Sequence, residues 1–330
     1  RTMTCLKYIV LFVVPFFLSV AIEESSVDVD IPGEFINKIV PSDLHVALCQ
    51  LSVSSDKSEN IKNAHQCIQK AVEDGAEMVV LPECWNSPYD TSLFRVYAES
   101  ITNGPSVHMM RQVALEKQVW IIGGTIPEID ESSSKIYNTC VVLRPDGTIE
   151  TIHRKMHLFD IDVVGAITFK ESDTLSAGNQ ITTFPTPFGV VGVGICYDLR
   201  FPELSLLMRS RGASILIFPS AFSATTGKAH WDILARARAV DTQSFVLMAS
   251  PARSVSGYQA WGHSLVVDPW GVVLGEADET PATIHATLTL DRVAEVRQSI
   301  PVSIQRRSDI YALTEVYSTN TYVSRLQEEV

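Results

Sequence analysis

The segment GVGICYDLRFPE, residues 192–203, decides the fold class of this chain. Its first part is apolar and rich in glycine, as in a buried strand, and it passes through a polar turn into a helix start. Cys196 stands at the turn. Backbone N–H groups and the helix dipole at such a turn favour a thiolate over a thiol of pKa about 8.5, and they can also hold an oxyanion. Because most cysteines are small buried hydrophobes, this position alone makes Cys196 only a candidate nucleophile.

Strands and helices alternate outward from this segment. An apolar stripe at i, i+3, i+4 spacing from Ile61 to Val72 predicts a helix that ends at Gly75. The sequence PDGT, residues 145–148, predicts a hairpin turn. Apolar runs predict strands at residues 46–51, 78–81, 119–122, 139–143, 149–152 and 245–248. This alternation indicates an α/β protein.

Two stretches of the chain repeat one pattern. GAEMVVLP, residues 75–82, and GASILIFP, residues 212–219, share Gly-Ala, an apolar run and a final proline. We therefore predict an α/β fold of two related halves whose sheets pack face to face with helices outside, a four-layer αββα sandwich. A chance match is the alternative explanation of the repeat, and the α/β prediction does not depend on it.

Composition and charge exclude several classes of protein. The 330 residues are 46% hydrophobic and 19% charged, which suits a sizeable core in one large domain or two. The net charge of −12 and the lack of a Lys/Arg-rich run argue against nucleic acid or an anionic membrane as partner. A small anionic substrate agrees with these numbers, because local Arg and Lys can override the global sign.

The six cysteines do not form a disulfide framework in a chain of this length. No Cys-x-x-Cys pair occurs, and no His/Cys cluster has zinc spacing, so we expect no metal. Four of the six lie in apolar contexts or beside a candidate site residue, and we expect these to be reduced. Cysteine usage therefore favours a cytoplasmic protein.

The N-terminal region points in another direction. A basic start precedes an apolar run at residues 8–22, which is short for a membrane span and fits a signal-peptide core. Residues 23–42 are acidic and polar, as in a tether. We expect residues 1–42 to form a hydrophobic segment and tether, the folded unit to span residues 43–315, and residues 316–330 to be a polar tail. Membrane contact or secretion follows only if residues 8–22 act as a signal.

Three chemically useful side chains follow three predicted strands. Glu83 stands after the strand at 78–81, Lys155 closes the strand after the hairpin, and Cys196 ends its own strand. Reactive groups collect at the carboxyl edges of strands in α/β sheets. A base, a cation for an oxyanion and a nucleophile are what thiol acyl transfer requires. Taken singly, Glu83 is more often a capping residue and Lys155 a surface lysine. For the three residues together, hydrolysis without a cofactor is the simplest chemistry.

The same segments resemble the three signature segments of the nitrilase, or carbon–nitrogen hydrolase, superfamily. They are LPE at residues 81–83, RKMHLFD at 154–160 and GICYDLRFPE at 194–203, and they occur in the family's order. The resemblance runs from about Leu44 to Tyr311, so residues 43–315 are expected to be a carbon–nitrogen hydrolase domain. It implies an αββα sandwich and a Glu–Lys–Cys triad that forms a thioester.

The resemblance also assigns roles. It implies that Glu83 is the base, Lys155 the oxyanion cation and Cys196 the nucleophile. The Tyr197 N–H completes the oxyanion site, and Glu171 matches the family's second, supporting glutamate.

Further segments resemble the ω-amidase, or Nit2-like, branch of the superfamily. They include SATTGKAHW at residues 223–231 and AWGHS at 260–264. Enzymes of this branch hydrolyse the terminal amide of 2-oxoglutaramate and 2-oxosuccinamate, so the substrate keeps a distal carboxylate. Arg200, four residues after the nucleophile, can supply a bidentate fork for it. Thr226 is a hydroxyl partner in a position that the family uses similarly. Tyr89 lines the pocket or is a packed loop aromatic.

Other functions stay open at this level. A deaminated-glutathione amidase, a β-ureidopropionase and a nitrilase use the same triad, and a non-catalytic, membrane-tethered relative is a further alternative that an intact triad argues against. The resemblance implies a homodimer in which residues 291–311 wrap a neighbour. It also implies a cytoplasmic or mitochondrial enzyme, in conflict with the apolar run at residues 8–22.

Overall fold

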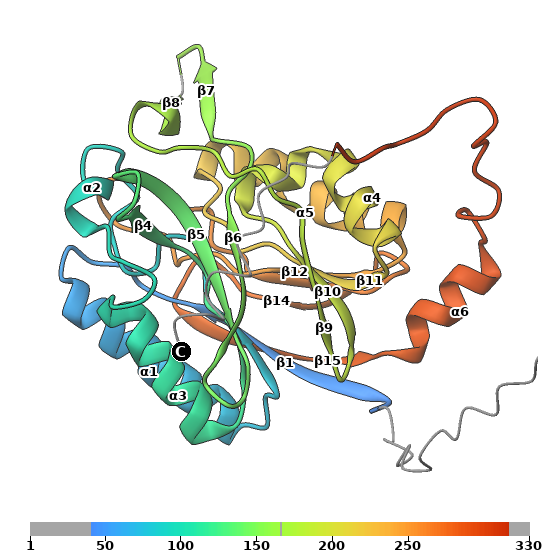
Figure 1. Ribbon diagram of the computed structural model, residues 1–330, viewed down its shortest axis with the longest axis horizontal. Coiled ribbons are helices and arrows are strands. Elements are labelled where there is room, and N and C mark those ends of the chain that lie inside the picture. Colours follow the sequence, from blue (N-terminus) through green and yellow to red (C-terminus); the bar gives the residue numbers. More distant parts are fainter. Residues whose placement is uncertain (1–40, 166, 317–330) are drawn as a thin grey trace, which may run out of the picture. The chain divides into compact units, whose positions relative to one another are not determined.

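Two β-sheets carry the fold in the computed structural model, which describes residues 41–165 and 167–316 (Figure 1). The first sheet has the order β15-β1-β2-β3-β5-β4, with β6 paired to β5, and the second has the order β14-β13-β12-β11-β10-β9. The first consists of β1 (Asp43–Gln50), β2 (Met78–Val80), β3 (Trp120–Ile122), β4 (Ile126–Asp130), β5 (Lys135–Leu143), β6 (Ile149–Arg154) and β15 (Ala282–Thr289). The second consists of β9 (Thr182–Thr186), β10 (Gly189–Val193), β11 (Ala213–Ile217), β12 (Phe245–Met248), β13 (Leu265–Val267) and β14 (Val273–Glu276).

The two sheets share one topology. In the first, β1, β2 and β3 run parallel and are flanked by antiparallel β15 and β5. In the second, β10, β11 and β12 run parallel and are flanked by antiparallel β9 and β13. The repeated sequence patterns lie on β2 and β11, the middle strand of each parallel trio. The prediction of two related halves is therefore confirmed.

Helices cover the outer face of each sheet (Figure 1). Residues on β1 alternate, because successive side chains of a strand point to opposite faces. Val46 and Leu48 join the core that also contains strands of the second sheet, whereas Ala47 packs with the helices outside the first sheet. The helices are α1 (Lys57–Glu73), α2 (Phe94–Tyr97) and α3 (Pro105–Lys117) in the first half, α4 (Pro202–Ser210) and α5 (Ala224–Thr242) in the second, and α6 (Asp291–Ser299). The four-layer αββα sandwich is confirmed.

Local sequence signals set the ends of these elements. The Asp56 side chain caps α1 by accepting hydrogen bonds from the N–H groups of Ser58 and Glu59. Gly75, with φ of 98°, follows the end of α1 as predicted. The 145–148 turn joins antiparallel β5 and β6, with Gly147 at φ 76°. β5, however, begins at Lys135, four residues before the predicted strand, and this extension contributes a residue to the site below.

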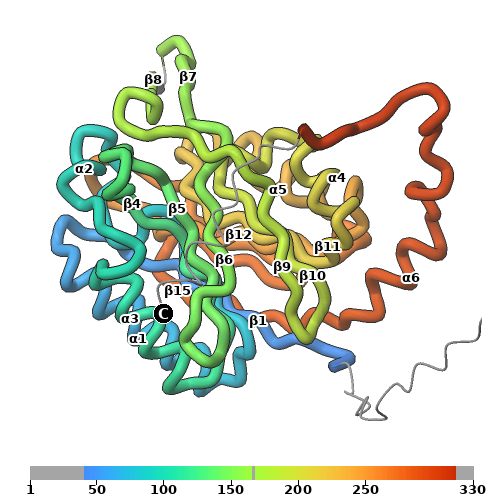
Figure 2. Tube along the Cα trace, viewed as in Figure 1, coloured from blue at the N-terminus to red at the C-terminus, as the bar shows by residue number. Residues whose placement is uncertain are grey.

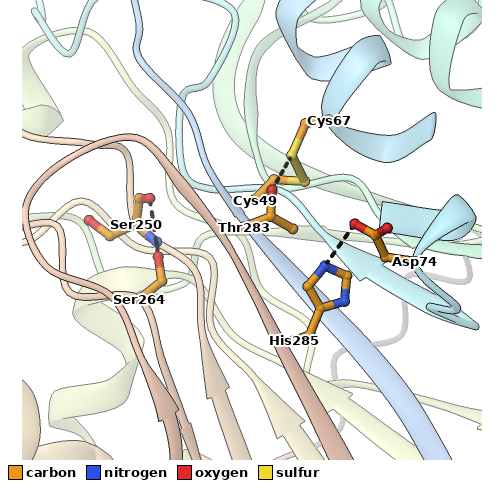
Figure 3. Close-up of a disulfide and its surroundings, with 7 residues drawn as sticks. All are labelled: Cys49, Cys67, Asp74, Ser250, Ser264, Thr283 and His285. Atoms are coloured by element: carbon orange, nitrogen blue, oxygen red, sulfur yellow. Dashed lines mark hydrogen bonds and ion pairs between the residues drawn. A yellow bond between two sulfur atoms is a disulfide. The ribbon is translucent and has the colours of Figure 1, made fainter. Parts of the chain in front are cut away.

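One prediction about the cysteines is wrong. Cys49 on β1 and Cys67 on α1 form a disulfide beside Thr283 (Figure 3). Both residues looked like ordinary apolar positions, since the sequence pattern places Cys49 on a buried strand and Cys67 on a helix but does not show that the two side chains face each other. Cys84, Cys140 and Cys196 are free thiols.

The terminal predictions lie almost wholly outside the described residues. The N-terminal segment and tether fall there up to residue 40, as does the tail from residue 317. None of the helices in residues 41–165 and 167–316 is both long and apolar enough to cross a membrane.

Candidate active site

Glu83, Lys155 and Cys196 meet in the interior between strand ends. Glu83 follows β2, Lys155 directly follows β6, and Cys196 begins a short 3₁₀ turn, η2 (Cys196–Arg200), after β10. Glu83 and Lys155 are 0% exposed and Cys196 is 3% exposed. The structure therefore brings together the three side chains that the sequence placed at separate strand ends.

Lys155 forms the centre of a buried charge cluster. Its Nζ lies 2.8 Å from Glu83 Oε1 and 2.9 Å from Glu171 Oε2. Glu171 starts a 3₁₀ turn, η1 (Glu171–Asp173), after the hairpin of β7 (Asp160–Val163) and β8 (Ile167–Lys170), which projects at the top of Figure 2. The Phe159 N–H donates to Glu171 Oε2 at 2.7 Å and the Tyr89 hydroxyl to Oε1 at 2.6 Å. Glu171 is thus held rigidly and in turn fixes the ammonium group.

Burial and charge set the pKa values of this cluster. Burial raises the pKa of Glu83 above its usual range, and the Lys155 ammonium offsets only part of that rise. For Lys155, burial lowers the pKa, but the Glu171 and Glu83 carboxylates outweigh it and hold the pKa well above its usual value. Lys155 is therefore charged at neutral pH, and Glu83 has the raised pKa that suits a general base.

The surroundings of Cys196 act against the thiolate that a strand-to-helix turn favours. Burial raises the pKa of the Cys196 thiol well above its ordinary value, and the neighbouring Glu83 carboxylate raises it further. The Ala221 N–H, which donates to the sulfur, does not compensate. A five-residue 3₁₀ turn starts at Cys196, while helix α4 begins only at Pro202, so the helix dipole that the sequence suggested lies further away. The thiol needs a base to become nucleophilic.

The backbone at Cys196 is itself unusual. Its φ of 48° lies in the left-handed region that non-glycine residues rarely adopt. The Cys196 N–H donates to the Pro219 carbonyl at 2.9 Å, which ties the turn to the end of β11. This geometry turns the side chain away from the regular path of the strand.

Asp198 joins the nucleophile turn to the lysine segment, a role that the sequence analysis did not assign. Its carboxylate accepts from the Ile195 N–H at 2.9 Å and from the His157 N–H at 2.9 Å. It also contacts His157 Nδ1 at 2.7 Å and His153 Nε2 at 3.3 Å. Burial raises the pKa of Asp198, but these contacts outweigh burial and hold the pKa well below its usual range. The family motif contains the signal, since Asp198 is an acidic residue between the nucleophile and the apolar Leu199 in this turn, and it is 0% exposed.

Arg200 and Thr226 lie on neighbouring elements. The Arg200 guanidinium stacks over the Phe222 ring at 4.8 Å and lies 3.2 Å from His230 Nδ1. It forms no ion pair with any Asp or Glu of the described residues. Thr226, in the first turn of α5, is four residues before His230 and so lies on the same helix face. Its hydroxyl contacts Ser223 Oγ at 3.1 Å, so it also belongs to the helix cap.

Aromatic rings surround the charge cluster. The Tyr89 ring stacks on Phe169 from the β7–β8 hairpin, with centroids 5.4 Å apart, and contacts Tyr258 at 4.5 Å. The Tyr258 hydroxyl donates to the Ala221 carbonyl at 2.6 Å. Tyr197 packs edge-on against Phe159. Sequence reasoning missed Tyr258, because nothing in the polar loop 253–259 indicates that its tyrosine turns inward.

Asn138 is a further residue that sequence reasoning missed. It lies on the extended part of β5 and its Nδ2 donates to Glu83 Oε1 at 2.8 Å. Asparagine is uncommon inside strands, so a buried asparagine between Tyr137 and Thr139 was the available signal.

Comparison with known proteins shows which family this chain belongs to. The carbon–nitrogen hydrolase family model matches residues 45–298. The chain is 50% identical over 273 residues to mouse omega-amidase NIT2 (82% of this chain, 98% of that protein) and 51% identical over 269 residues to the human protein (81% and 96%). The crystal structure of Saccharomyces cerevisiae Nit3, described as a member of branch 10 of the nitrilase superfamily, superposes with a TM-score of 0.75 at 44% identity (82% and 98%). That of the C. elegans NitFhit protein gives 0.76 at 35% (85% and 69%). The chain therefore belongs to the carbon–nitrogen hydrolase family, in the Nit2 branch of the nitrilase superfamily.

Proposed function

We propose that this protein is an ω-amidase that hydrolyses the terminal amide of 2-oxoglutaramate or 2-oxosuccinamate to 2-oxoglutarate or oxaloacetate and ammonia. The observation that carries the proposal is a buried Glu83–Lys155–Glu171 cluster beside the Cys196 thiol, in a chain about half identical to the omega-amidase NIT2 proteins. The intact cluster argues against a non-catalytic, tethered relative.

The reaction starts with a proton transfer. Cys196 is neutral at rest, and Glu83, whose second carboxylate oxygen has no hydrogen-bond partner among the described residues, takes the thiol proton. The sulfur attacks the amide carbon, and the carbonyl oxygen becomes an oxyanion that the Lys155 ammonium and the Tyr197 N–H stabilise. Glu83 returns the proton to the nitrogen, the C–N bond breaks, and ammonia leaves a thioester on Cys196. Glu83 then takes a proton from water as the water oxygen attacks the thioester carbon. The C–S bond breaks, and Glu83 returns the proton to the sulfur, which frees the acid product and the Cys196 thiol.

Arg200 and Thr226 bind the distal carboxylate of the substrate. Arg200 has no carboxylate partner of its own in the described residues, and its position over Phe222 leaves the guanidinium fork available. Thr226 supplies a hydroxyl from the same helix face as His230, which contacts Arg200. The Tyr89 and Tyr258 rings pack against each other beside the charge cluster, with centroids 4.5 Å apart.

A panel of amides tests the proposal. Purified full-length protein is incubated with 2-oxoglutaramate, 2-oxosuccinamate, deaminated glutathione, 3-ureidopropionate and a nitrile, and ammonia is measured. We expect release from the first two compounds, loss of activity in Cys196→Ala, and an acyl adduct on Cys196 by mass spectrometry. Preferential hydrolysis of deaminated glutathione would assign the rival amidase function. Undiminished activity of Cys196→Ala would contradict the mechanism.

We also propose a homodimer in which the segment after α6 contacts the neighbouring subunit. Residues 300–316 form a loop that swings out after α6 and returns toward α4 (Figure 1), and they expose apolar side chains, among them Ile304 and Ile310. Within the chain this segment is held by the Arg211–Glu315 ion pair and by Arg209 with Ser303. Light scattering of the full chain and of a chain ending at residue 299 tests this, with a dimer expected for the first and a monomer for the second. A monomeric full chain contradicts it.

We propose that the protein enters the secretory pathway, with residues 8–22 acting as a signal, and is not cytoplasmic. The Cys49–Cys67 disulfide argues against the reducing cytoplasm, because disulfides persist mainly in oxidising compartments. The apolar run at residues 8–22 fits a signal-peptide core. A C-terminally tagged protein with and without residues 1–42 tests this: the full chain is expected in the secretory pathway and the shortened chain in the cytoplasm. A cytoplasmic or mitochondrial location for both forms contradicts it.

A further inference from the structure

Asn138 makes one side-chain hydrogen bond within the described residues, and that bond is to Glu83. It is 1% exposed, in the middle of β5, and its Nδ2 lies 2.8 Å from Glu83 Oε1. Its Oδ1 is buried without a partner among the described residues. Its backbone carbonyl accepts the Lys155 N–H at 2.9 Å. One residue of β5 thus contacts both Glu83 and Lys155.

These contacts make the two oxygens of the Glu83 carboxylate unequal. Oε1 accepts from Lys155 Nζ and from Asn138 Nδ2, each at 2.8 Å. Oε2 is buried and receives neither of these bonds, and the Cys196 thiol is the further group that interacts with the Glu83 carboxylate. Two donors on one oxygen fix the rotation of the carboxylate, since turning it would exchange two charge-assisted hydrogen bonds for none. A proton from Cys196 then has only Oε2 to go to.

We propose that Asn138 is a positioning residue that holds Oε1 of Glu83, so that Oε2 serves as the base and later as the acid of the reaction. The inference rests on the proposed function for Glu83 and adds a residue to it. In the first step the S–H bond of Cys196 breaks as an O–H bond forms on Oε2. In the second, that proton passes from Oε2 to the leaving nitrogen as its bond to carbon breaks. Asn138 neither gains nor loses a proton.

A second function of Asn138 follows from the direction of its bond. An N–H donor stabilises the carboxylate form of Glu83 and not the neutral acid, so it opposes the rise in pKa that burial causes. The titratable or charged groups that face Glu83 are Lys155, Glu171, Cys196, Cys84, Tyr89 and Tyr258. Of these, only Lys155 donates to the same oxygen as Asn138. Removing Asn138 should therefore move the pKa of Glu83 upward.

The chain supplies a matched control in Asn86. This residue is also fully buried, and its Nδ2 donates to a glutamate, Glu99, at 2.6 Å. Its Oδ1 likewise has no partner among the described residues. Unlike Glu83, Glu99 bonds to Ser106 and lies among helix and loop contacts that do not include the thiol. Replacing Asn86 therefore removes a buried amide–carboxylate bond, together with its 3.0 Å bond to Ser106 Oγ, without removing a hydrogen-bond partner of the proposed base.

The experiment compares Asn138→Leu, Asn138→Ser and Asn86→Leu in the full-length protein. For each, kcat and KM for 2-oxoglutaramate are measured from pH 5 to 10, with the rate of Cys196 alkylation by iodoacetamide and the thermal midpoint. For both Asn138 variants we expect kcat to fall about 10- to 100-fold with KM little changed. The acidic limb of the kcat/KM profile should shift upward by about one to two pH units, because the lost hydrogen bond favoured the charged carboxylate. Asn86→Leu should lose thermal stability but keep its acidic limb.

The outcomes separate this inference from the proposed function. The positioning role of Asn138 is overturned if the acidic limb of the kcat/KM profile does not shift in Asn138→Ser, or if it shifts equally in Asn86→Leu. If Asn138→Leu does not fold, the result for Asn138→Ser decides. If neither the wild type nor any variant hydrolyses 2-oxoglutaramate, the proposed substrate is wrong. The alkylation profile of Cys196 then still tests Asn138, since it depends on Glu83 accepting the thiol proton and not on turnover. An alkylation profile that is the same with and without Asn138 overturns the role.

Discussion

The charge cluster at Lys155 leads to a prediction about stability. Lys155→Met keeps most of the side-chain volume but removes the cation between two buried carboxylates. At 2.8 and 2.9 Å, each ion pair has a Coulomb energy of about 6 kcal/mol at an effective dielectric constant of about 20. Desolvation cancels much of this, but breaking a buried pair commonly costs about 3–5 kcal/mol because a charge is left uncompensated. We expect a loss in that range, or roughly 10 °C in melting temperature.

A double-mutant cycle with Glu171→Gln sharpens the prediction. Glu171→Gln alone leaves the Glu83–Lys155 pair balanced and should cost about 1–3 kcal/mol through its lost charge-assisted bonds. In the double variant only Glu83 is left unpaired, and protonation can neutralise it. We therefore expect the double variant to be about 2–3 kcal/mol more stable than the sum of the two single losses predicts.

Equilibrium urea unfolding at pH 7 measures the four proteins of the cycle. Lys70→Met is the control, because Lys70 forms an exposed pair with Asp74 on the surface of α1 and its loss should change stability little. If the effects of Lys155→Met and Glu171→Gln add to within about 0.5 kcal/mol, the two residues are not one electrostatic unit and the reasoning is refuted. A Lys155→Met variant as stable as the wild type refutes it as well.

Three further predictions concern other parts of the molecule. Arg200→Lys should raise KM for 2-oxoglutaramate about 10-fold or more with little change in kcat, since a point charge replaces a bidentate fork; an unchanged KM in steady-state kinetics contradicts this. Reducing the Cys49–Cys67 disulfide, which closes a loop of 18 residues, should lower the free energy of unfolding by about 3 kcal/mol while activity persists. A thiol titration of the unfolded, unreduced protein that finds every cysteine free contradicts this prediction. Because the folded-state pKa of Asp198 is lowered, the ionised carboxylate stabilises the fold above the unfolded-state pKa of about 3.9, and this stabilisation is lost as the pH falls from there toward the folded-state pKa. Between pH 5 and 3, Asp198→Asn should therefore lose less free energy of unfolding than the wild type. Equal losses for the two proteins in urea unfolding contradict this prediction.

The fold was predictable where sequence patterns are local. The stripe from Ile61 to Val72 became α1 because an amphipathic helix buries every third or fourth residue, and the turn at 145–148 joined β5 to β6 because Gly147 adopts a positive φ. The start of β5 at Lys135 was missed, since its first residues pair with β4, a strand that the apolar pattern did not reveal.

The site residues were likewise predictable only where the sequence signal is local. The motif-bearing strand ends of Glu83, Lys155 and Cys196 were recognisable because each follows an apolar run directly. Asn138 and Tyr258 were not, because their partners are distant in sequence: Asn138 bonds to Glu83 from another strand, and the Tyr258 hydroxyl reaches Ala221 from a loop. A pattern of neighbouring residues contains no information about such pairings.

The sequence by itself predicted the α/β class and two related halves, and it singled out Glu83, Lys155 and Cys196 as candidate active side chains. These follow from local periodicity and from residue types at strand ends. Only the tertiary structure decided the direction in which the Cys196 pKa shifts, the pairing of Cys49 with Cys67, and which oxygen of Glu83 accepts from Lys155 and Asn138. The reason is that desolvation, Coulomb energy and hydrogen-bond geometry depend on distances between segments that only folding brings together.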